Sequence, residues 1–350
     1  MATDTRRYPR EELQALAAES LAAVGAPPDE AEFVAATLVS ADARGIHSHG
    51  LLRLPLYVES VEAGGIVAGA SLRWAREVGA TAVLDGGSGF GQVIMQAAVD
   101  KARDLAGRYG TATVAVQRGT HYGVGAYWTD QLARDGMIGI LVSTTGNSVA
   151  PHGSADKFIG TNPLSISFPT GGRPVTADMA TSAGAYGKLV DAAGAGREIP
   201  AGWAVDHDGV PTTDANAAVA GALIPFGGHK GSAIAVLVEL LAGAGGGGNF
   251  AYESVDIWND RSSQIGAGAL LIAIDLETLH GDRTALDRAA SFRADLTGLR
   301  PAKGTDRVLA PGDPEQITDD ANGADVTIPA HIDDALRATH LRVTTTATAR

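Results

Sequence analysis

Apolar residues in the first part of the chain recur at the spacing of an α-helix. Between residues 10 and 24, leucines and a valine follow each other every three to five positions, which predicts a helix with one buried face. Gly25 ends this helix, and Pro27-Pro28-Asp29 opens a second one that runs to about Ala43. A third helix is expected from Ser48 to Ala63, with inward positions at Leu51, Leu54, Tyr57, Val58 and Val61.

From about residue 70 the pattern changes to short apolar runs separated by helices and glycine turns. The expected strands cover residues 80–84, 112–117, 138–143, 164–168 and 270–274, and helices are expected over 92–109 and 123–135. This alternation predicts an α/β core. The run 232–244 contains Glu239 and is shorter than the roughly 20 residues of a membrane span, so it predicts a buried helix. Residues 243–248 are glycine except for Ala244, which predicts a mobile loop.

Composition narrows the class of protein. The chain has 350 residues, of which 45% are hydrophobic, enough for one large or two medium domains. The formal net charge of −13 disfavours nucleic acids and anionic membranes as partners. The absence of cysteine excludes disulfides and thiolate chemistry. No apolar segment follows Arg6-Arg7, so no secretion signal is expected and the predicted location is cytoplasmic.

Two histidines and one arginine are the candidate chemical groups. Ser48-His49-Gly50 is followed by Arg53, and on the expected third helix this four-residue spacing would place both side chains on one side. An imidazole can protonate a carbonyl oxygen, and a guanidinium can hold a neighbouring carboxylate. His121 comes where the second expected strand ends, a loop position that directs side chains into clefts. These groups indicate chemistry on a small 2-oxo or 2-hydroxy acid.

Glycine-rich segments are the candidate cofactor contacts. Asp85 to Gly91 follows a strand and precedes a helix, but its spacing is not Gly-x-Gly-x-x-Gly, so a Rossmann fold is not expected. Gly160 to Pro163, Asp178 to Ser182 and Gly187-Lys188 combine backbone donors, hydroxyls and a positive charge, which suits a pyrophosphate or a nicotinamide amide. Gly227 to Gly231 introduces a helix whose free amides can bind an anion.

In this order, the motifs resemble those of the type 2 malate/L-lactate dehydrogenase superfamily. Its members include ureidoglycolate dehydrogenase, 2,3-diketogulonate reductase, sulfolactate dehydrogenase and reductases of cyclic imino acids such as piperideine-2-carboxylate. The resemblance runs from about Glu11 to Asp313. The matching segments are Arg44 to Gly50, Asp85 to Gly91, His121 to Gly123, Gly160 to Pro163, Asp178 to Ser182, Gly209 to Asp214 and Gly227 to Gly231.

The resemblance implies a fold class and an assembly. The expected fold is α/β (α+β), with a non-Rossmann mixed-sheet cofactor domain and a helical domain built from both chain ends. The expected domains are residues 1–75 with about 285–350, which form a helical substrate or cap domain, and residues 76–284, which form an NAD(P)-binding and dimerisation core. The implied assembly is a homodimer. Each active site is expected where the helical unit meets the cofactor domain.

The resemblance also assigns roles to residues. His49 and His121 both remain candidates for the proton carrier, because different family members use different histidines. The implied substrate-binding residues are Ser48, Arg53 and Tyr57. The implied contacts to NAD or NADP are Asn162, Asp178, Met179, Ala180, Thr181, Ser182, Lys188, His229, Lys230, Pro311, Gly312 and Asp313. The chain departs from the family pattern at Thr120, where Asn is usual, and at Ser232, where Tyr is usual.

The expected activity is hydride transfer between a nicotinamide and C2 of a small 2-hydroxy or 2-oxo carboxylate such as malate, lactate or ureidoglycolate. A reductase of a cyclic imino acid is the alternative, because a C=N substrate fits the same geometry. Two other classes are a hydrolase with a metal held by His47, His49 and His121, and a binding protein without catalysis. The motifs leave open the substrate, the direction of the reaction and the choice between NAD and NADP.

Overall fold

The computed structural model describes residues 4–348 and is built around a mixed seven-stranded sheet. The strand order is β2-β3-β4-β11-β5-β6-β7, and only the β3–β4 pair of this sheet is parallel. The strands are β2 (Arg73–Val78), β3 (Thr81–Asp85), β4 (Thr111–Gly119), β5 (Met137–Ser143), β6 (Leu164–Phe168), β7 (Val175–Met179) and β11 (Ala267–Asp275). The mixed, non-Rossmann sheet expected from the resemblance is thereby confirmed.

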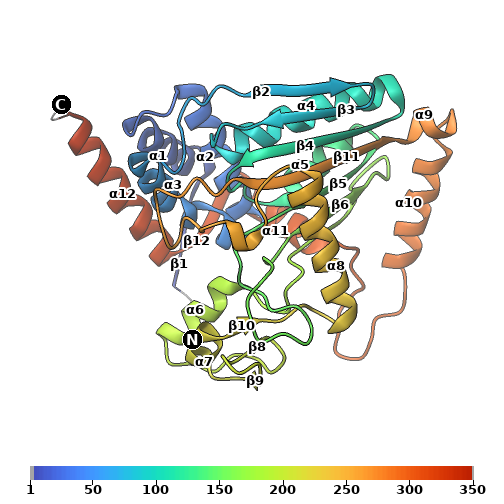
Figure 1. Cartoon of the computed structure of the whole chain (residues 1–350). Coiled ribbons are helices and arrows are strands. Elements are labelled where there is room, and N and C mark those ends of the chain that lie inside the picture. The colour runs from blue at the N-terminus through green and yellow to red at the C-terminus, as the bar shows by residue number, and fades with distance from the viewer. Residues whose placement is uncertain (1–3, 349–350) are drawn as a thin grey trace.

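Helices cover both faces of this sheet (Figure 1). The helices α4 (Gly91–Tyr109) and α5 (Gly125–Arg134) pack on one face, against residues such as Val114. The helix α8 (His229–Glu239) and the π-helix η3 (Leu240–Gly245) pack on the other, against residues such as Ala115. Since successive side chains of a strand point to opposite faces, a strand covered on both sides needs a continuous apolar run.

The two ends of the chain form one helical unit, as expected. The strand β1 (Thr5–Pro9) pairs antiparallel with β12 (Asp325–Pro329). The helices of this unit are α1 (Arg10–Ala23), α2 (Pro28–Ala43), α3 (Leu54–Ala63), α11 (Asp313–Asn322) and α12 (Ala330–Thr348). One apolar cluster, which includes Leu13, Leu38, Leu54, Val326 and Leu336, joins α1, α2, α3, α12 and β12, whereas α11 contacts α2 through a hydrogen bond from Asn322 to Ala43. Residues far apart in the sequence therefore share a core.

A smaller lobe lies below the sheet in Figure 1. Its three short strands, ordered β10-β8-β9, pack with two helices over Leu189, Ala204 and Ala218. Its elements are α6 (Tyr186–Gly194), β8 (Ala204–Val205), β9 (Pro211–Thr212), α7 (Ala215–Ala220) and β10 (Ala222–Leu223). Three further helices are η4 (Ala251–Glu253), α9 (Leu276–His280) and α10 (Thr284–Thr297), and the last two project on the side away from α1, α3 and α12 in Figure 1.

The core strands and helices expected from the sequence are present, but the expectations for residues 232–248 were wrong. The run 232–244 is not fully buried, because one face of α8 and η3 is exposed, as at Leu237 (59% exposed). The glycine-rich segment is not simply a loop, because η3 includes its first residues. A Cβ on Gly246 would lie 2.2 Å from the carbonyl oxygen of Ala242, so glycine there allows close packing. No described helix is long and apolar enough to cross a membrane.

Candidate active site

Asp42, at the end of α2, organises the Ser48-His49-Gly50 turn. Its fully buried carboxylate bonds His47 Nδ1 at 2.7 Å and accepts the backbone N–H of Leu51 at 2.7 Å. A Cβ on Gly50 would lie 2.3 Å from the Asp42 carboxyl carbon, so only glycine fits there. Two 3-10 turns, η1 (His47–His49) and η2 (Leu51–Arg53), therefore precede α3. The expectation that one helix begins at Ser48 and carries both His49 and Arg53 was wrong.

The two candidate histidines lie face to face. The His49 ring stacks on the His121 ring with centroids 5.5 Å apart and planes inclined by 25°. His121 follows β4, where Thr120 Oγ1 donates to the carbonyl oxygen of Gly89 at 2.6 Å. A Cβ on Gly91 would lie 2.4 Å from the His121 carbonyl oxygen. The glycines that fail as a dinucleotide fingerprint thus let the start of α4 approach the His121 loop.

Tyr57 links His121 to α4. Its side chain is fully buried, and its hydroxyl lies 2.5 Å from His121 Nδ1. Gln92 Nε2 donates to the same hydroxyl oxygen at 3.0 Å. Because a phenol can donate to or accept from a ring nitrogen, Tyr57 can hold His121 in either protonation state. The hydrogen bond at Nδ1 leaves Nε2 as the nitrogen that can exchange a proton with a substrate.

Burial and a neighbouring positive charge keep both imidazoles neutral at neutral pH. Burial and, second, the Arg53 guanidinium lower the pKa of His49 to about 4. The same causes, with a contribution from His49, hold the pKa of His121 well below its usual value. Burial raises the pKa of Tyr57 to about 12, so its hydroxyl stays protonated. A neutral imidazole beside a cation can accept a proton from a hydroxyl group.

Arg53 lies beside the histidine pair with one edge of its guanidinium already bound. Arg53 Nε donates to the carbonyl oxygen of Ser48 at 2.7 Å, and the Ser48 hydroxyl bonds His49 Nδ1 at 2.9 Å. Among the described residues, no protein atom accepts a hydrogen bond from Arg53 Nη1 or Nη2. Those two nitrogens form the planar fork that binds a carboxylate through two parallel hydrogen bonds.

Two of the candidate cofactor segments and the residue before a third meet at the edge of the sheet where β5 and β7 end and β6 begins. The backbone N–H of Thr181 donates to Thr161 at 2.8 Å, and that of Phe226 donates to Thr181 at 3.0 Å. Asp178 Oδ2 accepts the N–H of Ala126, at the start of α5, at 2.8 Å, and burial raises the pKa of Asp178 to about 6. The His121 loop and residues 178–182 are therefore neighbours.

Gly227 and Gly228 have φ angles of +62° and +64°, and no side chain caps the first turn of α8. A Cβ on Gly231 would lie 1.6 Å from the carbonyl oxygen of Phe226. His229 and Lys230 are exposed at this helix start. Uncapped amides at a helix start, with a histidine and a lysine side chain beside them, fit a phosphate group.

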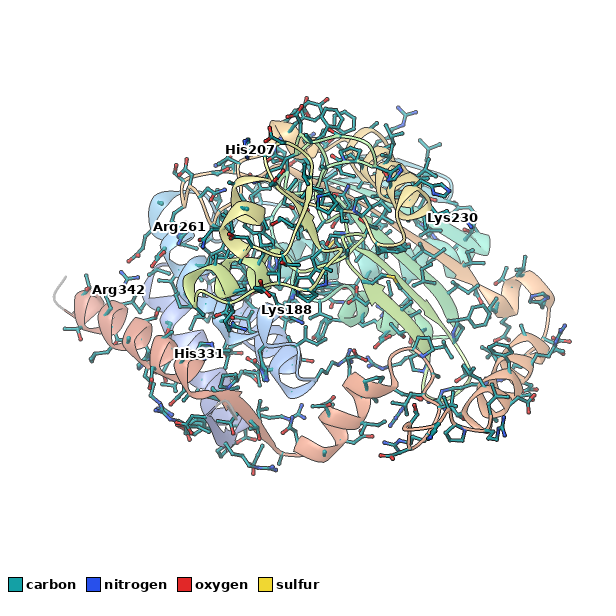
Figure 2. All side chains as sticks on the ribbon, turned by 90° about the horizontal axis from the view of Figure 1, so that it is seen from below. Lys188, His207, Lys230, Arg261, His331 and Arg342 are labelled. Atoms are coloured by element: carbon teal, nitrogen blue, oxygen red, sulfur yellow. The ribbon has the colours of Figure 1, made fainter. Side chains whose placement is uncertain are left out.

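Several other candidate cofactor residues have partners within the chain. Asn162 is buried and donates through Nδ2 to Glu239 Oε2 at 2.5 Å, which joins its loop to α8. Asp313 pairs with Arg293 and accepts the N–H of Ala310 at 2.9 Å. Pro311 accepts the N–H of Thr176, so residues 311–313 lie beside β7. The exposed Lys188 and Lys230 lie on separate parts of the surface (Figure 2).

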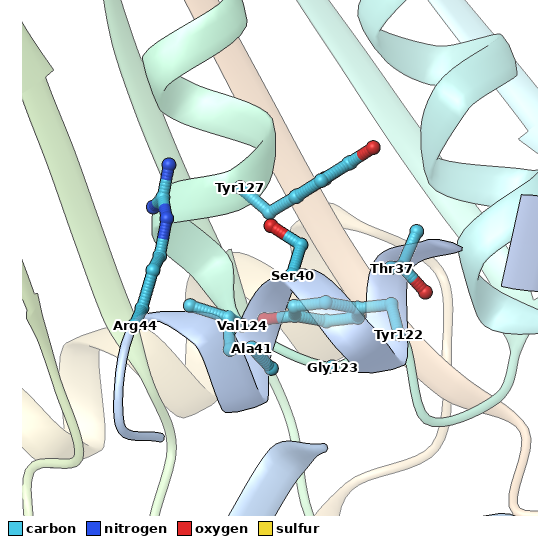
Figure 3. A pocket seen from close by; sticks show the side chains of 8 residues that line it. All are labelled: Thr37, Ser40, Ala41, Arg44, Tyr122, Gly123, Val124 and Tyr127. Carbon is cyan, nitrogen blue, oxygen red and sulfur yellow. The ribbon is translucent and has the colours of Figure 1, made fainter. Parts of the chain in front are cut away.

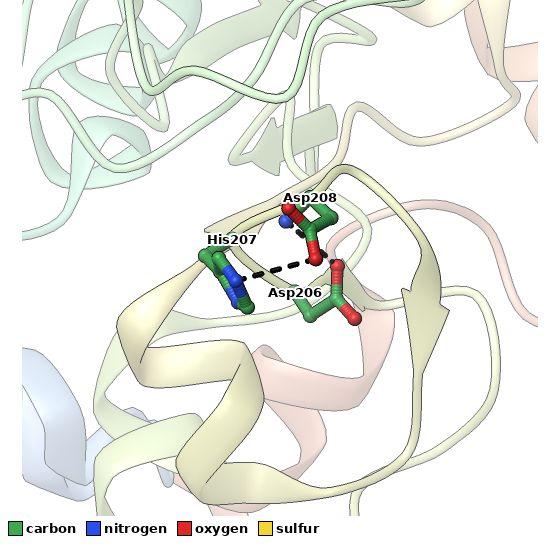
Figure 4. A group of neighbouring side chains, drawn as sticks. All are labelled: Asp206, His207 and Asp208. Atoms are coloured by element: carbon green, nitrogen blue, oxygen red, sulfur yellow. Dashed lines mark hydrogen bonds and ion pairs between the residues drawn. The ribbon is translucent and has the colours of Figure 1, made fainter.

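The metal-site interpretation finds no support in the histidine geometry. His47 is turned to Asp42, away from the stacked pair. Within residues 4–348, the side chains close enough to share an ion are Asp206, His207 and Asp208 instead (Figure 4). Asp206 Oδ1 already accepts the N–H groups of Asp208 and Val210 at 3.0 and 2.9 Å, so this cluster is explained by the turn between β8 and β9.

A small cavity separates α2 from the start of α5 (Figure 3). Its volume is about 10 Å³, enough for one water but too small for a substrate. Arg44 lines it and pairs with the buried Asp130 of α5 at 3.3 Å. Asp130 also accepts hydrogen bonds from Ser167 and Thr176. This contact fastens the helical unit to the sheet beside the histidines.

The motif order, the fold and the grouped histidines and arginine agree with the family comparison. The family model described as malate/L-lactate dehydrogenase matches residues 8–337. The chain belongs to the malate/L-lactate dehydrogenase family.

Individual relatives differ in what their names say they act on. The chain is 36% identical to an L-sulfolactate dehydrogenase of Methanothermobacter thermautotrophicus over 313 residues, 89% of each chain. It is 38% identical to a Δ1-pyrroline-2-carboxylate/Δ1-piperideine-2-carboxylate reductase of Pseudomonas syringae pv. tomato over 325 residues, 80% of this chain and 91% of the relative. The solved sulfolactate dehydrogenase of Methanocaldococcus jannaschii superposes with a TM-score of 0.90 at 31% identity, covering 97% of this chain and 98% of that one.

The cofactor class follows from family members whose names state it. An Escherichia coli ureidoglycolate dehydrogenase, 34% identical over 309 residues (88% of each chain), is named for NAD(+). A (2R)-3-sulfolactate dehydrogenase of Chromohalobacter salexigens, 36% identical over 265 residues (75% of this chain and 79% of the relative), is named for NADP(+). This member of the malate/L-lactate dehydrogenase family is an oxidoreductase, and its cofactor is NAD or NADP.

Sequence reasoning missed three residues of this malate/L-lactate dehydrogenase family site. In the sequence, Asp42 is an ordinary polar position of the second expected helix, and Gln92 is simply the first residue of the helix expected over 92–109. Trp258 lies in a loop with no motif, yet its ring contacts the Arg53 guanidinium. Only the high glycine content before Gln92 hinted that another backbone approaches that helix closely.

Proposed function

We propose that the protein transfers a hydride between NAD(P) and C2 of a small 2-hydroxy or 2-oxo carboxylate. The observation that carries this proposal is the convergence of the stacked His49–His121 pair with an arginine whose Nη1 and Nη2 remain free. One group can move a proton, and the other can hold a carboxylate within reach of it. A small acid bound between them would place its C2 oxygen beside an imidazole.

His121 is the proposed proton carrier. The Tyr57 hydroxyl, itself held by Gln92, bonds Nδ1, so Nε2 exchanges a proton with the oxygen on C2. In oxidation, the neutral ring accepts the hydroxyl proton. In reduction, the protonated ring donates it, and a bound carboxylate promotes that form because it offsets the Arg53 charge that lowers the pKa of His121. His49 packs on the ring and contributes to this low pKa.

The proposed cofactor contacts are the segments implied by the resemblance. The uncapped start of α8, with His229 and Lys230, suits a phosphate, and residues 178–182 with 311–313 line the region beside the His121 loop. The buried Asn162 and Asp313 would shape these segments through their internal partners. Lys188 remains a proposed contact from α6. The nicotinamide supplies or accepts the hydride when it is bound.

A cyclic imino acid is the second candidate substrate. It is favoured by the 38% identity to the pyrroline-2-carboxylate/piperideine-2-carboxylate reductase. The same Arg53 fork would hold the carboxylate, and His121 would exchange a proton with nitrogen instead of oxygen. Both substrates thus use one site.

A screen with both cofactors tests this function. We expect turnover, seen as a change in nicotinamide absorbance, with at least one member of a panel of malate, lactate, ureidoglycolate, sulfolactate, 2,3-diketogulonate and cyclic imino acids. A chelator should leave the rate unchanged, because the site needs no metal. Cofactor binding without turnover on the whole panel, or a rate abolished by chelation, would contradict the proposal. The substrate and the preferred cofactor emerge from the same data.

We also propose that the protein is a homodimer, joined through the exposed apolar face of α8 and η3. Ile234, Leu237, Leu240 and Leu241 recur at helical spacing on this face and are 38–59% exposed. Apolar side chains grouped in this way mark an interface more often than a free surface. A cytoplasmic location stays a prediction.

Leu237→Glu should dissociate this dimer. A charge at the centre of an apolar interface loses its hydration without gaining a partner. We expect light scattering to give a dimer mass for the native chain and a monomer mass for Leu237→Glu. Leu279→Glu, at an equally exposed leucine on α9 (62%), is the control and should remain dimeric. A native monomer, or a Leu237→Glu dimer, would refute this interface.

A further inference from the structure

The loop between η4 and β11 is fastened to α3 beside Arg53. Arg261 Nε pairs with Glu59 Oε2 at 2.7 Å, and Arg261 Nη1 donates to the carbonyl oxygens of Ile257 and Trp258. The Ile257 side chain is buried in the core of the helical unit. Trp258 therefore has a fixed place near the substrate site, although its own side chain is 46% exposed.

The Arg53 guanidinium lies over the face of the Trp258 ring. The guanidinium carbon lies 4.8 Å from the ring centroid, within range of a cation–π interaction. The Nε edge is held separately, by the Ser48 carbonyl oxygen at 2.7 Å. Two independent contacts thus restrain the guanidinium, and among the described residues its Nη1 and Nη2 atoms donate to no protein acceptor.

The acidic residue Asp256 lies near Arg53 and can compete for its guanidinium, so the contact with Trp258 matters. Burial lowers the pKa of Arg53, and the nearby Tyr57 and the carboxylate of Asp256 act in the opposite direction. Asp256 Oδ1 accepts the backbone N–H of Trp258 at 2.9 Å. Within residues 4–348, Arg53 and Asp256 form no ion pair at 4.0 Å or less. Without the indole, the flexible Arg53 side chain could turn toward Asp256 and withdraw its open edge.

We propose that Trp258 is a positioning residue that holds the Arg53 guanidinium so that its Nη1–Nη2 edge faces the substrate carboxylate. This inference rests on the proposed function. Trp258 acts on substrate binding through Arg53, and it has no part in proton transfer by His121. Its loss should therefore raise KM for carboxylate substrates and leave kcat nearly unchanged.

The test compares Trp258→Ala with Trp258→Phe on the best substrate from the screen. Losing a cation–π contact at a partly desolvated site should raise KM about 3- to 30-fold. Phenylalanine keeps an aromatic face and should restore most of the affinity. Trp74→Ala is the matched control. Trp74 lies on β2, outside the site, and its ring centroid is also 4.8 Å from a cation, the Nζ atom of Lys101. It should change neither constant.

A wild-type KM in Trp258→Ala, or a loss confined to kcat, would overturn the inference. The carboxamide of the substrate is a further check, because its binding does not need the fork and its KM should not respond to Trp258→Ala. If the panel gives no turnover, the proposed function fails first. The binding of oxamate, a small carboxylate, can then be measured by calorimetry and still tests whether Trp258 positions Arg53. The affinity for oxamate should fall in Trp258→Ala and recover in Trp258→Phe. Equal affinity in all three proteins would refute it.

Discussion

His121→Ala should lower kcat by about 10²- to 10⁴-fold, the range that general acid–base catalysis contributes. Its Nδ1 is held by the buried Tyr57 hydroxyl, which Gln92 fixes in turn, whereas His49 Nδ1 bonds the exposed hydroxyl of the neighbouring Ser48. His49→Ala should cost much less, because it removes a packed neighbour and leaves the proton carrier in place. The measurement is steady-state kcat of both variants, with cofactor binding checked by nicotinamide fluorescence.

The outcome that would reverse this assignment is a near-complete loss of activity in His49→Ala with substantial activity in His121→Ala.

The pH profile of the enzyme adds an independent check. Because burial and Arg53 lower the pKa of His121, the free enzyme keeps its imidazole neutral below the usual pKa of about 6.5. In the oxidative direction, kcat/KM should therefore stay level from neutral pH down through 6.5 and fall only at lower pH. A fall that begins above pH 6.5 would contradict it.

The sequence predicted the core of this fold because the decisive signals were local. The runs 112–117, 138–143 and 164–168 became β4, β5 and β6, with shifts of at most two residues at either end. Short strands such as β8 to β10, with two residues each, leave no periodic pattern to detect. The pairing of β1 with β12 joins residues more than 300 positions apart, so no window of sequence contains it.

The candidate site was predictable in its residue types but less so in its geometry. Spacing suggested that His49 and Arg53 share a helix face, whereas the buried carboxylate of Asp42 bends this segment into two turns. The glycines before Gln92 were correctly rejected as a Rossmann fingerprint, but their closeness to His121 depends on tertiary contacts. The expected domain limits, residues 1–75 with about 285–350 against 76–284, stay a prediction.

Arg53→Ala should raise KM for the carboxylate substrate by about 10²-fold or more, because truncating one partner of a buried hydrogen-bonded charge pair costs about 2–5 kcal/mol. The open Nη1–Nη2 edge would be lost, and no other described cation lies against the stacked histidines to replace it. Arg53→Lys keeps the charge but not the planar fork, so it should recover only part of the affinity. The measurement is the steady-state KM of the wild type, Arg53→Ala and Arg53→Lys for the best substrate from the screen.

Arg342→Ala is the matched control for this change. Arg342 also binds a carboxylate with both Nη atoms, at 2.9 Å to each oxygen of Glu62 on α3, but at the exposed surface. Its removal should leave KM unchanged, because exposed pairs contribute little and this one lies outside the site. If Arg53→Ala and Arg342→Ala behave alike, the carboxylate does not bind at Arg53. If Arg53→Ala instead lowers kcat at unchanged KM, the guanidinium acts only in the transition state. The proposal that Nη1 and Nη2 of Arg53 bind the substrate carboxylate before the reaction would then be wrong.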